Sequence, residues 1–69
     1  MATVTLQHTN ALGTRNVYVN ATLTPDIARE EFTPFGWCTL LFCELGAVWV
    51  NGRMAEVRAK IINAAEGGE

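Results

Sequence analysis

One apolar run, residues 35–50, constrains this chain more than any other stretch. The run holds sixteen residues, of which only Glu44 is charged, and it contains both tryptophans, Trp37 and Trp49. A chain of 69 residues buries only about 60% of the surface that it exposes when unfolded, so its margin of stability is thin. Keeping this run out of water must therefore dominate the folding of the chain.

The run is apolar on both faces when it is read as extended strand. Residues 37–45 place cysteine, leucine and phenylalanine on one face and tryptophan, leucine and cysteine on the other. Strands that are covered on both sides have this pattern. Gly46 interrupts the run, and residues 47–50 form a second two-sided segment. We therefore predict a hairpin of these two strands that turns near Leu45 and Gly46.

Two stretches before the run alternate between apolar and polar side chains. Residues 3–8 alternate with period two, and residues 17–23 do so more clearly, with several β-branched side chains. Such alternation predicts strands with one apolar face. Residues 10–16 show no periodicity and are predicted to form a loop, so the two strands are expected to pair as a hairpin.

A short helix is predicted at residues 24–32. Thr24 is a suitable N-cap, and Pro25 would occupy the first helical position. Pro34 and Gly36 are expected to stop the helix near its last residue.

A longer amphipathic helix is predicted at residues 53–65, ending before Gly67. Met54, Val57 and Ile61 recur at helical spacing, and the segment is rich in good helix formers. The Asn-Gly pair just before it is also a strong hairpin signal, which leaves a strand at the start of this segment as the alternative.

The order strand, strand, short helix, strand, strand, helix predicts one small α+β domain over residues 1–69. We expect an antiparallel sheet of about four strands and one C-terminal amphipathic helix. That helix can cover one face of the sheet, but the short helix is too small to cover the other. The second face is therefore expected to need another protein chain. The residues predicted to lie at this interface are Phe35, Trp37, Leu41 and Trp49.

The reactive side chains do not form a recognisable chemical motif. Cys38 and Cys43 are five residues apart, which puts them on opposite faces of a strand and disfavours a disulfide between them. Zinc typically needs four ligands, and His8 is the only histidine in the sequence. Glu30 and Glu31 are interpreted as a solvated helix face. We therefore predict buried structural thiols, no catalytic residue, no metal site, no cofactor and no enzymatic activity.

The charge and the hydropathy pattern argue against nucleic acid and membranes as binding partners. A net charge of −2 gives no electrostatic attraction for nucleic acid, and an aromatic platform for single strands would need a basic groove. The apolar run is shorter than the roughly 20 residues of a membrane span, and Glu44 would be costly there. The N-terminus lacks a basic stretch followed by an apolar one, so secretion by a signal peptide is not expected. We predict a cytoplasmic or virion-associated protein.

These observations predict a non-enzymatic protein-interaction module that self-associates as a homo-oligomer or is embedded in a larger assembly. Its size, its lack of a catalytic constellation and its expected need for a partner are typical of small phage-encoded structural or accessory proteins. Two alternatives stay open. One is a small inhibitor that docks on one host protein, and the other is a membrane-associated protein that uses residues 35–50.

Overall fold

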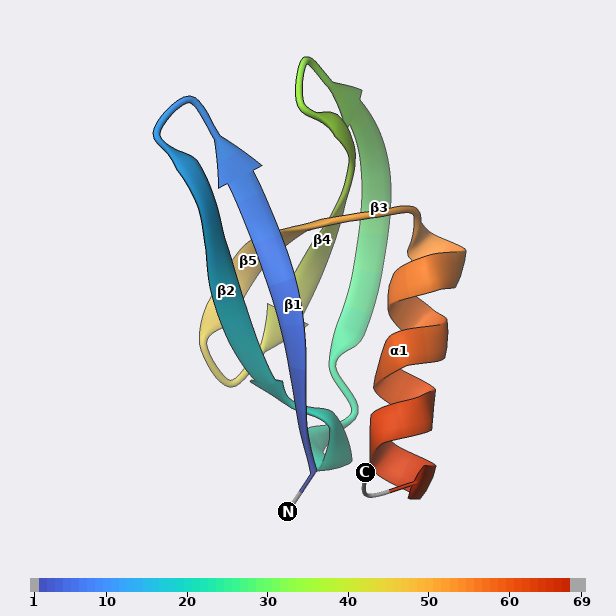
Figure 1. Ribbon diagram of the computed structural model, residues 1–69. Coiled ribbons are helices and arrows are strands. Elements are labelled where there is room, and N and C mark those ends of the chain that lie inside the picture. Colours follow the sequence, from blue (N-terminus) through green and yellow to red (C-terminus); the bar gives the residue numbers. More distant parts are fainter. Residues whose placement is uncertain (1, 68–69) are drawn as a thin grey trace.

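The computed structural model describes residues 2–67, which form strands followed by one C-terminal helix (Figure 1). The α+β class predicted from the sequence is confirmed. The strands form two antiparallel sheets, β1–β2 and β3–β4–β5, where a single sheet was predicted. The elements are β1 (Thr3–Asn10), β2 (Gly13–Asn20), a 3₁₀ turn (Ala21–Leu23), β3 (Asp26–Thr33), β4 (Gly36–Cys43), β5 (Gly46–Asn51) and α1 (Met54–Gly67).

The three hairpins of the fold share one kind of turn. Two loop residues are followed in each case by a glycine with positive φ, at Gly13 (122°), Gly36 (103°) and Gly46 (92°). The turn predicted near Leu45 and Gly46 is confirmed. The loop predicted at residues 10–16 is wrong, because Asn10 pairs directly with Gly13 and most of that segment belongs to β2.

The short helix predicted at residues 24–32 is also wrong. These residues form most of β3, which pairs with β4 from Asp26 to Thr33 except at Ala28. Thr24 adopts a left-handed conformation with φ of 52° and closes the 3₁₀ turn, so it caps no α-helix. Pro34 and Gly36 occupy the second and fourth positions of the β3–β4 turn, which both residue types favour. Residues that end a helix therefore also suit a hairpin, and the long-range pairing with β4 decides between the two.

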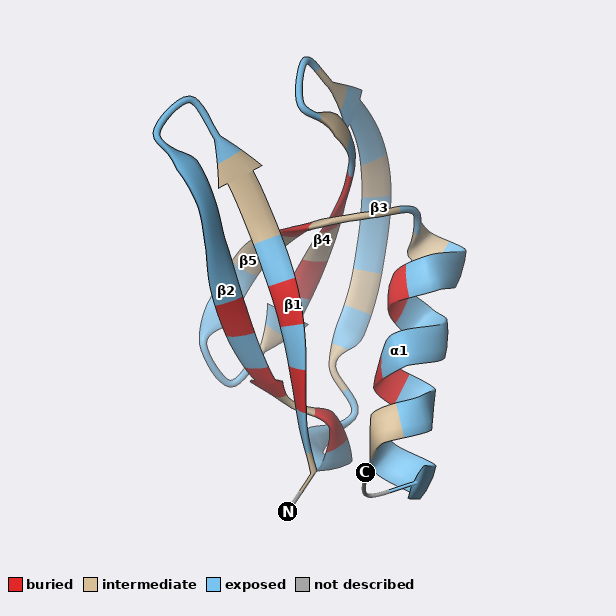
Figure 2. Ribbon diagram, in the orientation of Figure 1, coloured by how far each residue is buried: buried red, intermediate tan, exposed pale blue. Residues whose placement is uncertain are grey.

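The core lies between the β1–β2 hairpin, α1 and one face of the β3–β4–β5 sheet, which we call the inner face (Figure 2). The alternation predicted at residues 3–8 and at residues 17–20 is confirmed, since Val4, Leu6, Val17 and Val19 point into this core. The second strand was predicted to continue to residue 23, but Ala21–Leu23 form the 3₁₀ turn and Leu23 is exposed. The helical stripe is confirmed as well, with Val57 and Ile61 buried and Met54 half-buried. The buried apolar residues of the core cluster are Val4, Leu6, Val17, Val19, Ala21, Leu41, Val50, Val57 and Ile61.

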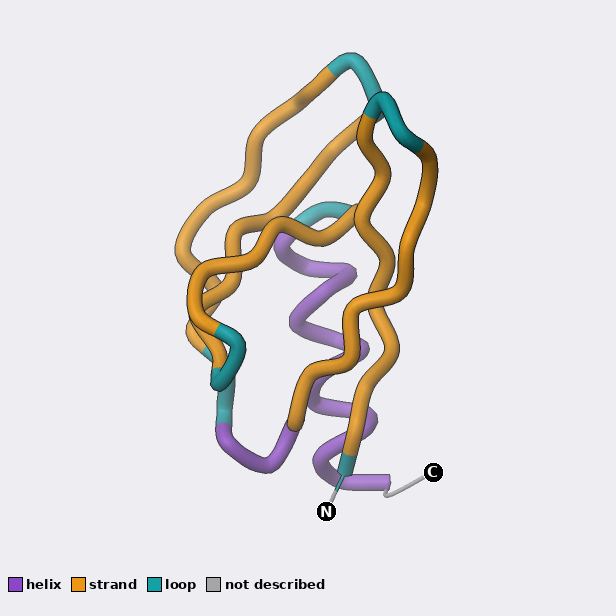
Figure 3. Tube along the Cα trace, turned by 90° about the vertical axis from the view of Figure 1, so that its left-hand side faces the viewer, coloured by secondary structure: helices purple, strands orange, loops and turns teal. Residues whose placement is uncertain are grey.

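Strand β5 crosses β1 and joins the two sheets through side-chain hydrogen bonds. The Thr9 backbone N–H donates to Asn51 Oδ1 at 3.1 Å, and Asn51 Nδ2 donates to Thr9 Oγ1 at 2.8 Å. The view in Figure 3 shows α1 running alongside the strands, so that β1 begins and α1 ends at the same end of the molecule. The β3–β4–β5 sheet turns one face toward the core, and its opposite face points away from the core.

Candidate interaction surface

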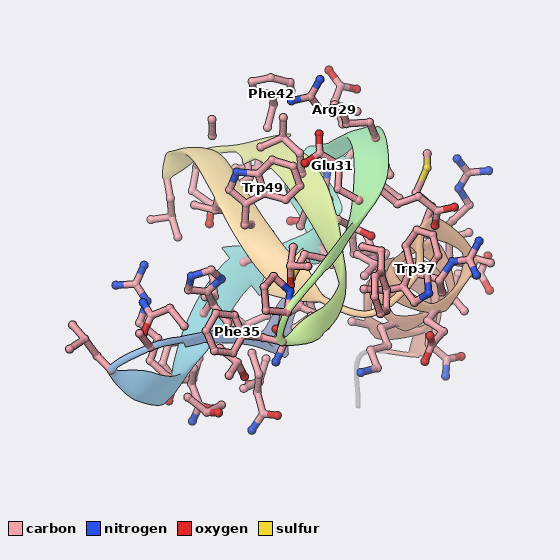
Figure 4. All side chains as sticks on the ribbon, turned by 90° about the horizontal axis from the view of Figure 1, so that it is seen from above. Arg29, Glu31, Phe35, Trp37, Phe42 and Trp49 are labelled. Atoms are coloured by element: carbon pink, nitrogen blue, oxygen red, sulfur yellow. The ribbon has the colours of Figure 1, made fainter. Side chains whose placement is uncertain are left out.

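The candidate site is the face of the β3–β4–β5 sheet that is turned away from the core, here named the outer face. The strand pairing defines its members, because Leu40 pairs with Trp49 and Phe42 pairs with Ala47. An irregularity in β3 around Ala28 shifts the alternation of that strand. The outer face comprises Asp26, Arg29, Glu31, Leu40, Phe42, Ala47 and Trp49, together with Cys38 and Asn51 at the end that β1 approaches through His8 and Thr9. Figure 4 shows Arg29, Glu31, Phe42 and Trp49 on the same side of the sheet.

The centre of the outer face is apolar and partly exposed. Phe42 is 49% exposed, Ala47 is exposed, and Leu40 and Trp49 are half-buried. Large aromatic side chains bury about 150–250 Å² each when they are fully covered. Within residues 2–67, these exposed fractions leave the middle of the outer face without a covering element.

Two opposite charges lie beside these aromatic side chains. Arg29 Nη2 is 3.1 Å from Glu31 Oε2, and the two side chains are 64% and 48% exposed. The Arg29 guanidinium carbon also lies 5.9 Å from the centre of the Trp49 ring. An ion pair this exposed contributes little to folding stability, so its main consequence is for what can bind to the outer face.

A small pocket opens beside Trp49 at one end of the outer face. Its volume is about 190 Å³, and His8, Glu31, Thr33, Cys38 and Trp49 line it. His8 Nδ1 is buried there without a hydrogen-bond partner in the described chain. Pockets that bind small molecules usually measure about 300–1,000 Å³, so this one is too small to indicate a ligand.

The two cysteines lie on opposite faces of β4, as the odd spacing predicted. Cys38 is buried at 4% exposure, and its thiol lies 3.8 Å from Thr33 Oγ1. Cys43 is half-buried against the core, and both thiols are free. These contacts fit the structural role predicted for the two thiols.

Trp37 belongs to a second aromatic cluster beside α1. Its ring packs edge-on against Phe32, with 5.4 Å between the ring centres, and the Arg53 guanidinium lies 3.8 Å above it. Arg53 donates to both carboxylate oxygens of Glu30 at 3.1 and 2.9 Å, and the Met54 N–H donates to the same carboxylate at 2.9 Å. These donors, Arg53 first, lower the pKa of Glu30 from 4.5 to about 2. The cluster therefore holds the start of α1 against β3.

The four residues predicted to form one interface are separated in the structure. Trp49 lies on the outer face, whereas Trp37 lies on the side of α1 (Figure 4). Phe35 is in the β3–β4 turn and is 50% exposed. Leu41 is 0% exposed because its pairing with Ile27 and Val48 places it on the inner face, so it belongs to the core and has no surface to offer a partner.

Of the residues on the outer face, the sequence reasoning predicted only Trp49 as an interface residue. The sequence could have identified Phe42, because the alternation of side chains along β4 places Phe42 on the opposite face from Trp37 and Leu41. It could not have identified Arg29 and Glu31, since they were assigned to a helix. Their place on the outer face depends on β3 being a strand and on the irregularity at Ala28.

No known protein family, curated protein or solved structure matches this chain. Among the described residues, no group of three or more histidine, cysteine, aspartate or glutamate side chains is placed to hold a metal ion. No helix between residues 2 and 67 is long and apolar enough to cross a bilayer.

Proposed function

We propose that this chain is a non-enzymatic protein-interaction module whose outer face is covered by another protein chain. The observation that carries the proposal is the group of apolar side chains at the centre of that face, with Phe42 49% exposed and Trp49 beside it. Contiguous exposed apolar patches usually mark sites of interaction. Aromatic residues and arginine are also enriched among the residues that contribute most to protein–protein binding, and the outer face contains both.

The size of the domain strengthens this proposal. A domain of 69 residues has a stability of about 3–10 kcal/mol by the usual per-residue range. Burying one large apolar side chain contributes roughly 1.5–3 kcal/mol. Covering Phe42 and the rest of Trp49 in a complex would therefore be a substantial gain for this domain. The module would then act as a small structural or accessory component of an assembly.

Site-specific photo-crosslinking tests the proposal. A photoreactive phenylalanine analogue at Ala47, which is exposed on the outer face, should give a protein adduct in the cells that produce the chain. The same analogue at Ala55, which is exposed on α1, should give none. The adduct at position 47 should disappear when Phe42→Glu is added.

Far-UV circular dichroism of the Phe42→Glu variant must match that of the unchanged chain, so that a folding defect is excluded. Absence of any adduct at position 47, or equal adducts at positions 47 and 55, would contradict the proposal.

A further inference from the structure

Strand β2 is the edge of the β1–β2 sheet that lies on the far side of β1 from α1 (Figure 1). In an antiparallel pair, the backbone N–H and C=O groups of successive residues point alternately toward the neighbouring strand and away from it. The Asn20 N–H points away from β1, because it donates to Glu44 Oε2 at 2.9 Å. By alternation, the backbone groups of Tyr18, Asn16 and Thr14 also point away from β1.

The opposite strand gives the same assignment. Thr14 pairs in register with Thr9, whose N–H points away from β2 and donates to Asn51. Among residues 2–67, β1 is the only strand that pairs with β2. The N–H and C=O groups of Thr14, Asn16 and Tyr18 therefore form an open ladder that faces solvent, and we call these three residues the open edge.

This edge is unprotected, whereas the β3 edge of the other sheet is protected. β3 is irregular at Ala28, carries four charged residues and is tied to α1 by Glu30, which accepts from Arg53 and Met54. Irregularities, charges and covering elements are the means by which proteins keep edge strands from pairing. β2 pairs with β1 over eight residues without a register shift, contains no proline and carries Arg15 as its single charge.

A groove of about 320 Å³ lies beside the open edge. Leu45 and Val48 line it together with residues 15–18 of β2, and Leu45 is 57% exposed. In a strand added to β2, every second side chain would point to the same side of the sheet as Val17. Apolar side chains at those positions would contact Leu45 and Val48.

The charge of the groove adds to the specification of the partner. Arg15 lines the groove and lies on the same side of β2 as Val17. It forms no ion pair with any residue between 2 and 67. An acidic side chain on the added strand would therefore find an available guanidinium.

We propose that an extended segment of another protein chain binds to β2 as an additional strand. Donors and acceptors that recur every two residues, about 6.8 Å apart, match another extended backbone. In this mode of binding, main-chain hydrogen bonds give affinity and alternate side chains give specificity. The segment carries apolar side chains at alternate positions and an acidic side chain near Arg15. The Glu44 carboxylate already accepts from the Asn20 N–H, so the added strand ends at Tyr18.

Amide hydrogen exchange measured by NMR tests the pairing with defined peptides. Two capped peptides of alternating valine and threonine, matched to β2 in length, carry a glutamate at the first or at the last position and so cover both strand directions. At saturating concentration, one of them should slow exchange of the Asn16 and Tyr18 amides at least about tenfold. The Val17 amide points toward β1 and should exchange as before.

Backbone methylation of the peptide provides the first control. A peptide N-methylated on every threonine loses its donors along one edge, and a peptide N-methylated on every valine loses them along the other. One form should therefore lose the effect on Asn16 and Tyr18, and the other form should keep it.

Two variants at Asn16 provide the second control. Asn16→Pro removes an N–H that points away from β1, which is where edge strands tolerate proline, and should abolish the effect on Tyr18. Asn16→Ala keeps the N–H and should preserve the effect. Both variants lose the hydrogen bond from Asn16 Nδ2 to the Tyr18 hydroxyl, so they differ in the backbone donor. Circular dichroism checks that they are folded, and the N-methylated peptides decide if Asn16→Pro is not.

Unchanged exchange with both peptides, equal slowing by the two N-methylated forms, or equal slowing in folded Asn16→Pro and Asn16→Ala would overturn the inference. Slowing that rises with the concentration of the chain alone would also overturn it, because a second copy would then occupy the open edge. The open edge is separate from the outer face, so these results leave the crosslink from position 47 as the test of the proposed function.

Discussion

Replacement of Ile61 by alanine measures how strongly α1 holds the fold, because the next residue provides a matched control. Ile61 is 7% exposed and belongs to the core, whereas Ile62 is 48% exposed on the same helix. The two substitutions remove the same atoms from neighbouring positions, so a difference between their effects on stability reflects the difference in burial.

The expected loss at Ile61 follows from its surroundings. The change removes three carbon atoms, worth about 0.8 kcal/mol each when buried, or roughly 2.4 kcal/mol in total. A groove of about 380 Å³ beside Ile61 and Ile62 gives the site room to relax, so the added cavity cost should be small. The better helix propensity of alanine returns about 0.4 kcal/mol. The free energy of unfolding should thus fall by about 2–3 kcal/mol.

The same reasoning predicts a small effect at Ile62. About half of its side chain is already in water, and the helix propensity of alanine offsets part of what is lost, so the change should cost less than about 1 kcal/mol. Urea unfolding, followed by tryptophan fluorescence and far-UV circular dichroism, gives the free energy of unfolding of both variants. The slope of this free energy against urea concentration should be the same in both variants and in the unchanged chain.

If Ile61→Ala leaves too little folded protein to measure, Ile61→Val should show a loss of about 1 kcal/mol. Equal losses at the two positions, or a larger loss at Ile62, would refute the packing of α1 described above.

Three further changes test other parts of the structure. Glu30→Gln removes a carboxylate whose pKa is lowered to about 2, so it should flatten the pH dependence of stability. In the unchanged chain this contribution is present above about pH 4.5 and is lost as the pH falls toward about 2; urea midpoints across that window, compared between the two proteins, check it. Gly36→Ala should cost about 1–2 kcal/mol, because Gly36 has a φ of 103° and an added Cβ meets nothing within 4 Å, which leaves backbone strain as the cause. An unchanged urea midpoint would contradict that. Thr39→Val should cost about 1–2 kcal/mol, because the buried Thr39 hydroxyl donates to the Gly52 carbonyl at 2.8 Å. Thr39→Ser keeps the hydroxyl donor, so the NMR chemical shift of the Gly52 carbonyl carbon should remain unchanged in that variant.

The sequence by itself determined the elements whose pattern is local. Alternation around Val4 and Leu6 identifies β1, and the spacing of Val57 and Ile61 identifies the buried side of α1. These patterns need no knowledge of the rest of the fold, because side-chain direction repeats every two residues in a strand and every 3.6 in a helix. The α+β class and the apolar strand pair predicted at residues 37–45 and 47–50 follow from the same local information.

Tertiary structure alone decided β3 and, with it, the charges of the outer face. Residues 26–33 contain good helix formers, yet pairing with β4 makes them a strand, and the irregularity at Ala28 then turns Arg29 and Glu31 outward. Register also decided which aromatic side chains meet, since a shift of one residue moves a strand's side chains to the opposite face. The division into two sheets was likewise beyond the sequence pattern. It depends on β5 crossing β1 and on the Thr9–Asn51 hydrogen bonds, between residues 42 positions apart in the chain. Contacts of that separation leave no periodic signal in the sequence, because they are set by how complete elements pack against one another.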